Sequence, residues 1–281
     1  MLDIIYNLLS FLPFEWARNE SFVFMKHAFM ALLFTMPVLG LVGTVVVEKR
    51  MAFFSDALGH GAFAGVAVGA VVGMSKPLLS ALIFAVIFAV TVTGVSHRLR
   101  LSMDASIGAL ASFFMALGLF VATFGGGNLN ALTNFLVGDI LTVTVSDIAV
   151  VFLVFIFTIL VWSLLYNPLT LSSVYKQIAI SRGVRVLLLD MLFASLLAVI
   201  VTVGIQWLGM LTVNACLVLP ATTARIWARQ AKSYQWIATL LALVAGISGL
   251  LLSWYLGTLV GATSVLVLSL FFAVSLLWQR K

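Results

Sequence analysis

Long apolar runs dominate this sequence and restrict what it can fold into. Most are close to the roughly 20 residues that an α-helix needs to cross a hydrocarbon layer of about 30 Å. Of the 281 residues, 63% are hydrophobic and only 9% are charged, whereas a soluble domain carries about 25% charged residues. Such a chain cannot cover its own surface with polar groups. We therefore predict an all-α polytopic membrane protein, one transmembrane domain over residues 1–281, with no room for a soluble catalytic domain.

The lengths of the apolar runs predict about nine membrane-spanning helices, within bounds of eight to ten. The predicted spans are 23–47, 54–73, 78–96, 105–124, 145–166, 187–205, 210–224, 235–254 and 258–277.

The basic residues predict the orientation of these spans. All Lys and Arg residues except Arg18, Lys26 and Lys76 fall in alternate loops and in the C-terminal tail. Short cytoplasmic loops carry an excess of Lys and Arg. The N-terminus is therefore predicted outside and the C-terminus in the cytoplasm. The net charge of +6 follows from these loops, so no nucleic-acid partner is expected.

Two segments outside the spans have distinctive compositions. Residues 1–22, with Phe11, Phe14 and Trp16, are predicted to form an amphipathic helix on the outer surface. Residues 125–144 begin with three glycines and contain Asp139. This second segment is too long for a tight turn and too polar for a span, so we predict a broken or re-entrant stretch that is covered by protein.

A third segment, residues 167–186, is the longest predicted cytoplasmic loop. It starts at Asn167-Pro168 and contains a short stretch, 174–180, that is compatible with a helix. Gly183 is expected to end that helix.

Asp56 and His60 are the most informative polar residues within an apolar run. They are four residues apart, and such residues lie one turn apart on nearly the same face of a helix. A carboxylate and an imidazole in this arrangement can bind one divalent transition metal, Zn²⁺ and Mn²⁺ included. The alternative is a carboxylate at the start of the helix and a packed histidine, and the spacing alone leaves both interpretations open.

Glycines repeat every four residues after this pair. Gly61, Gly65, Gly69 and Gly73 form a stripe of small residues, which allows a second helix to approach closely. The same helix is thus predicted to be tightly packed and polar at one end, a combination that suits the lining of a translocation path.

The predicted span 210–224 is short and polar. Pro220 removes a backbone hydrogen bond and can kink the helix. Asn214 and Cys216 are candidate metal ligands. The alternative for Asn214 is a hydrogen bond between helices, and the alternative for Cys216 is that it is buried and unreactive. Because Cys216 is the single cysteine, an internal disulfide is excluded.

The remaining polar residues near span ends have simpler interpretations. His97 lies in a basic loop and is expected to be solvated or near lipid headgroups, and Asp104 fits the start of a helix. Asp190 has no partner that the sequence identifies. The chain contains no Gly-x4-Gly-Lys-Ser/Thr phosphate loop, no His-Glu-x-x-His motif and no Gly-x-Ser-x-Gly motif. It is therefore not expected to be an enzyme or to hold a permanently bound cofactor.

Five segments, in chain order, resemble the bacterial zinc, manganese and iron ABC transporter permeases of the metal ABC-3 type. The similarity runs over nearly the whole chain. It is carried by Arg-Met-Ala-Phe-Phe-Ser-Asp-Ala-Leu-Gly-His at 50–60, Phe-Leu-Val-Gly-Asp-Ile-Leu at 135–141 with Asp147, Gly-Val-Arg at 183–185, residues 209–225, and Gly-Ala-Thr at 261–263.

This resemblance implies the permease subunit of an ATP-driven metal importer in the bacterial inner membrane. Two permease copies would form the pore, two ATP-binding-cassette ATPase subunits would dock on the cytoplasmic side, and an extracytoplasmic protein would deliver the metal. It assigns metal coordination to Asp56 and His60, to which Asn214 is a possible addition.

The resemblance also assigns the 167–186 loop to coupling with the ATPase, through Ser173, Tyr175, Lys176, Ala179 and Gly183. The family often has an acid early in this segment, and here Ser173, Tyr175 and Lys176 stand there instead.

Zinc is the predicted cargo, with manganese and iron as alternatives. A carboxylate and an imidazole suit all three metals. Two other functional classes remain open: a secondary metal transporter that works without ATP, and a membrane scaffold or intramembrane enzyme that moves no ions.

Overall fold

The computed structural model describes residues 16, 19–74, 77–99, 101–124 and 138–279. Within these residues every regular element is a helix. The α-helices are α3 (Val23–Glu48), α4 (Phe54–Val71), α5 (Pro77–Leu99), α6 (Met103–Phe124), α8 (Val145–Val174), α9 (Lys176–Ser181), α10 (Val186–Leu208), α11 (Met210–Trp227), α12 (Ala231–Leu256) and α13 (Val260–Gln279), and the 3-10 helices are η1 (Glu20–Phe22) and η2 (Ile140–Thr142).

Eight of the described helices are long and apolar enough to cross a membrane: α3, α4, α5, α6, α8, α10, α12 and α13. The remaining predicted span, 210–224, forms the 18-residue helix α11, which is not among the eight described helices that are long and apolar enough to cross a membrane. The prediction of an all-α, multi-pass membrane protein is confirmed.

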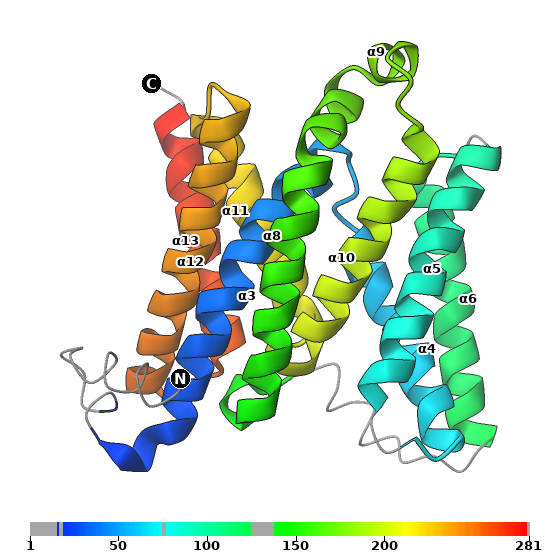
Figure 1. Cartoon of the computed structure of the whole chain (residues 1–281). Helices are drawn as coiled ribbons and strands as arrows, with labels where there is room; N and C mark the ends of the chain where they lie inside the picture. The colour runs from blue at the N-terminus through cyan, green and yellow to red at the C-terminus, as the bar shows by residue number, and fades with distance from the viewer. Residues whose placement is uncertain (1–15, 17–18, 75–76, 100, 125–137, 280–281) are drawn as a thin grey trace.

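The helices form two groups joined by a central pair (Figure 1). On one side α3 packs against α11 and α12, and α13 packs against α11 and α12. On the other side α4 packs against α5 and α6. Between them, α8 contacts α3, and α10 contacts α5 and α4. α9 and the end of α13 lie at one end of the bundle, and the starts of α3 and α8 lie at the other (Figure 1).

The coupling loop is shorter than the sequence predicted. α8 ends at Val174 rather than at residue 166, so Asn167 and Pro168 lie inside the helix. A proline removes only its own backbone hydrogen bond, and membrane helices tolerate that loss when neighbouring groups compensate. The short helix α9 follows at once, and Gly183 then turns the chain with a φ of 79°.

Two predicted segments fall largely outside the described residues. Of the amphipathic helix expected over 1–22, only Trp16 and the residues from Asn19 onward are described. Of the re-entrant stretch expected over 125–144, residues 138–144 are described. They form η2 and the start of the turn into α8, and Asp139 accepts a hydrogen bond from the backbone N–H of Leu141 at 3.0 Å.

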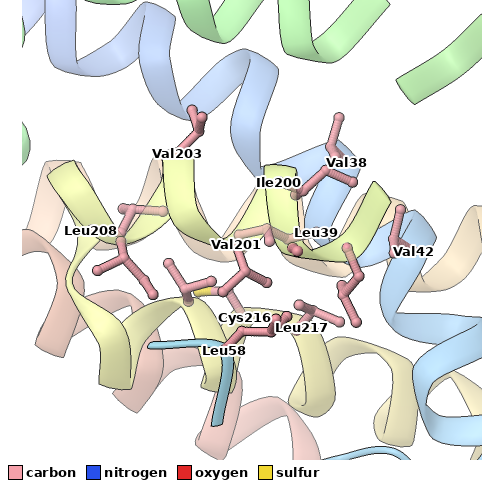
Figure 2. Packing of buried hydrophobic residues seen from close by; sticks show 14 of the residues in the cluster. Val38, Leu39, Val42, Leu58, Ile200, Val201, Val203, Leu208, Cys216 and Leu217 are labelled. Carbon is pink, nitrogen blue, oxygen red and sulfur yellow. The ribbon is translucent and has the colours of Figure 1, made fainter. Parts of the chain in front are cut away.

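The buried core lies where α3, α4, α10 and α11 meet (Figure 2). Leu39, Leu58, Val201 and Leu217, one from each helix, are at most 1% exposed. Lipid tails are as apolar as these side chains, so close van der Waals packing rather than exclusion from water holds the helices together.

Close packing is most evident between α4 and α5. A Cβ added at Gly65 would lie 2.5 Å from the backbone oxygen of Ser80, and one at Gly61 would lie 2.9 Å from Cβ of Phe88. Gly69 lies against the Ser80 side chain. Gly73 does not share the packing role expected from its spacing. It has a φ of 79° with nothing within 4 Å of an added Cβ, because it turns the chain at the end of α4.

We expect Gly65→Ala to lower the stability of the folded chain by about 1–3 kcal/mol, because the added methyl group meets backbone that cannot move aside. Gly108→Ala on α6 is the matched control, since nothing lies within 4 Å of its added Cβ. There alanine should be neutral or stabilising by up to about 1 kcal/mol. Thermal unfolding in detergent measures both changes, and equal behaviour of the two variants would contradict this account of the α4–α5 contact.

Candidate metal-translocation site

Helix α4 places Asp56 and His60 inside the bundle. It is the least apolar of the eight candidate spans and also the most buried. Both side chains are partly buried, whereas Ser55, Leu58 and Gly59 around them are fully buried. Ionisable groups in a span are costly to expose to lipid and face the protein interior or a cavity. The pair is therefore partly enclosed by protein.

Neither Asp56 nor His60 forms a hydrogen bond or an ion pair with any other described residue. A polar group that is withdrawn from water without a partner costs free energy, and its lone pairs stay available to a cation. The described residues contain no cluster of three or more His, Cys, Asp or Glu that could hold a metal. Asp56 and His60 could supply two ligands to a cation, whereas a structural zinc site has four.

Asn214 of α11 contacts α4 at Ser55, the residue before Asp56. The Ser55 hydroxyl donates a hydrogen bond to Oδ1 of Asn214 at 2.6 Å. This bond joins α11 to α4 at the residue before Asp56. The amide oxygen has two lone pairs, so the bond to Ser55 leaves one of them. The sequence did not identify Ser55 as a partner of Asn214. Its position next to Asp56 was the one signal that could have indicated a role for it.

The start of α11 makes a second contact with α4. A Cβ at Gly59 would lie 2.5 Å from Sδ of Met210, so Met210 packs at the residue before His60. Met210 also lines a cavity of about 740 Å³. The other lining residues are Gly138–Leu141, Trp207–Gly209, Leu211, Thr212, Thr258–Ala262, Val265 and Leu266.

Cys216 does not join Asn214 near the pair. Residues two apart on a helix do not share a face. Its side chain is fully buried and lies with Leu58, Val201 and Leu217 in the apolar core (Figure 2). The structure thus supports the packing interpretation of Cys216.

The residues predicted for coupling lie at the end of the bundle that carries α9 (Figure 1). Ser173 donates a hydrogen bond to the Glu48 carboxylate at 3.0 Å. Tyr175 is 60% exposed, and Ala179 is fully buried. Lys176 is exposed at the start of α9. The short helix therefore has one buried anchor and an exposed outer surface.

The fold is shared with a chain of known structure. The structure superposes on a chain of "PsaBC from Streptococcus pneumoniae in complex with Fab" with a TM-score of 0.78. The alignment covers 98% of this chain and 95% of that one at 24% sequence identity. At this identity the match establishes the shared fold.

Sequence comparison gives the family. The profile of the ABC 3 transport family matches residues 21–279, so the chain belongs to that family, whose members are ABC transporter permeases. One relative is "Manganese transport system membrane protein MntC" of Halalkalibacterium halodurans, 28% identical over 97% of this chain and 93% of the relative. Another is "High-affinity zinc uptake system membrane protein ZnuB" of Haemophilus influenzae, 27% identical over 85% of this chain and 91% of the relative.

The Ser55–Asn214 bond should contribute to stability as a pair. We expect Ser55→Ala and Asn214→Ala each to cost about 1–3 kcal/mol, because each leaves a polar partner with a missing bond. The double variant should cost less than the sum of the two single variants. Ser269→Ala is the control, since Ser269 is exposed and bonds only the backbone of its own helix. Strict additivity in thermal unfolding would show that this bond does not hold α4 to α11.

Proposed function

We propose that this chain is the permease subunit of an ATP-driven importer of divalent transition-metal ions. The observation that carries the proposal is the enclosed Asp56/His60 pair, which has no protein partner among the described residues. It lies on the most buried of the candidate spans. The names of the relatives, which refer to manganese transport and zinc uptake, support metal as the cargo.

The proposed orientation places α9 in the cytoplasm of a bacterial cell, with the chain in the inner membrane. The loops at this end carry most of the basic residues, as expected of the cytoplasmic side. Two ATPase subunits would dock there, around the exposed residues Tyr175 and Lys176. A second copy of the chain would complete the pore, and an extracytoplasmic protein would supply the metal from the opposite side.

The metal has to lose water before it reaches α4. Dehydrating a divalent cation is expensive unless polar ligands replace the lost shell. Asp56 supplies negative charge, and His60 supplies a ring nitrogen that must be neutral to bind. Water or the free lone pair of Asn214 would add the remaining ligands. A site with only two strong protein ligands binds weakly enough to release its ion, which transport requires.

Zinc is the first proposed cargo, and manganese is the second. At a given set of nitrogen and oxygen ligands, divalent zinc binds more tightly than manganese or iron. Manganese is favoured by the names of several relatives, and iron completes the series. Because the pair suits all three ions, the delivery protein is expected to decide which ion reaches it.

We expect Asp56→Ala to abolish metal uptake while the transporter still assembles, because it removes the negative charge that replaces the cation's water. The assay places the chain with its ATPase and delivery protein in liposomes and measures uptake of Zn²⁺, Mn²⁺ and Fe²⁺ with and without ATP. His60→Ala should reduce uptake by at least about tenfold, in line with the loss of one metal-binding group.

Asp104→Ala is the matched control, since Asp104 is an exposed acid in the first turn of α6. It should transport at the normal rate. Uptake by Asp56→Ala equal to that of the natural chain would remove the site assignment. Flux that does not depend on ATP would replace the importer with a secondary transporter.

A further inference from the structure

A partly buried ionic cluster joins Lys49, Asp190 and His97, none of which belongs to the proposed metal-binding pair. Lys49, which follows α3, donates to the Asp190 carboxylate of α10 at 2.7 Å. Nε2 of His97, near the end of α5, lies 3.0 Å from the second oxygen of Asp190. Their side chains are only 10%, 18% and 23% exposed for Lys49, Asp190 and His97. His97 is therefore partly buried and bonded to Asp190, and Asp190 has two partners that the sequence did not identify.

The same cluster reaches the last turn of α8, directly before α9. Lys49 also donates to the hydroxyl of Ser172 at 3.2 Å. The adjacent Ser173 donates to the carboxylate of Glu48 at 3.0 Å. The segment proposed to receive force from the ATPase is thus bonded through two consecutive serines to the end of α3.

Lys49 begins the segment that leads to the metal pair. In Figure 1 this segment descends from the end of α3 toward the start of α4. It turns at Arg50, whose φ of 57° is in the left-handed region, the one such non-glycine residue among those described. The backbone N–H groups of Arg50 and Met51 bond Val47 and Val46 at 3.1 and 2.9 Å, which closes a Schellman turn that normally favours glycine.

The segment from Lys49 to Asp56 is held at both ends by the C-terminal half of the chain. Lys49 is tied to Asp190 at the start of α10, and Ser55 is tied to Asn214 on α11. A cavity of about 630 Å³ adjoins the first tie and is lined by residues that include Glu48, Lys49, His97 and Asp190. A displacement of the end of α8 therefore reaches Asp56 through bonded groups and has space in which to occur.

We propose that Lys49 and Asp190 are positioning residues that transmit the movement of α9 to the Asp56/His60 segment, with His97 orienting the Asp190 carboxylate. This inference rests on the proposed function, since it needs an ATPase that moves α9. The opposite charges of Lys49 and Asp190 strengthen the hydrogen bond between them and fix its geometry. A partly buried carboxylate that bonds two partners holds both in fixed places, and loss of one charge leaves the other without compensation.

The test measures metal ions taken up per ATP hydrolysed in the assembled liposome system. Lys49→Met and Asp190→Asn are expected to lower this ratio by about two- to thirtyfold, the range over which single residues alter coupling between sites. ATP hydrolysis itself should persist. The conservative variants Lys49→Arg and Asp190→Glu retain the opposite charges and should recover most of the ratio.

Two control variants each remove one charge, of the same sign as Lys49 or Asp190, from the same end of the bundle but outside the cluster. Lys232→Met acts at the start of α12, and Asp104→Asn acts at the start of α6; both residues are exposed. Each should leave the ratio unchanged. If Lys49→Met fails to assemble, Asp190→Asn still tests the tie, because its amide retains an oxygen that Lys49 can bond.

The outcomes separate the two proposals. ATP-driven uptake by the natural chain, with an unchanged ratio in Asp190→Asn, overturns this inference and leaves the proposed function in place. If ATP hydrolysis and metal uptake fall together in the variants, so that the ratio of ions to ATP is unchanged, the cluster has only a structural role. That result also overturns this inference. No ATP-driven uptake by the natural chain overturns the proposed function and this inference together.

Discussion

The enclosure of a polar helix within an apolar bundle is the constraint on which the rest of this structure depends. α4 carries a carboxylate and an imidazole, and in a membrane such groups must be kept from lipid. Glycines on α4 allow α5 to approach until backbone meets backbone at Gly65. α6, α10 and α11 complete the enclosure. The packing that excludes lipid from α4 is thus the same packing that surrounds the pair proposed to bind the cation.

Polar bonds between distant segments then fix α4 in the bundle. Van der Waals contacts alone are non-directional, whereas a hydrogen bond between helices sets a register. Ser55 and Asn214 supply such a bond at the start of α4, at the residue before Asp56. Asp56 and His60 themselves have no such bond among the described residues. The neighbouring residues therefore carry the structural role, which is consistent with the proposed role of the pair in binding metal.

At the other end of the segment from Lys49 to Asp56, ionic contacts rather than close packing join the helices. Lys49, Asp190 and His97 join α3, α10 and α5 close to α9. Positive residues at a cytoplasmic face are expected from topology alone, yet Lys49 is only 10% exposed and is committed to one carboxylate. A basic residue expected from topology alone thus also joins distant helices in the fold.

The sequence by itself determined the class of fold and the identity of the candidate pair, because both depend on local properties. Apolar run length predicts spans, and four-residue spacing brings Asp56 and His60 to one face of whichever helix forms. Residue order also predicted the short helix ended by Gly183. Tertiary structure decided which polar residues have partners. Ser55 and Asn214 are 159 positions apart, and Lys49 and Asp190 are 141 apart. Only the way the helices pack brings such residues within bonding distance, since no local pattern encodes a contact across the bundle.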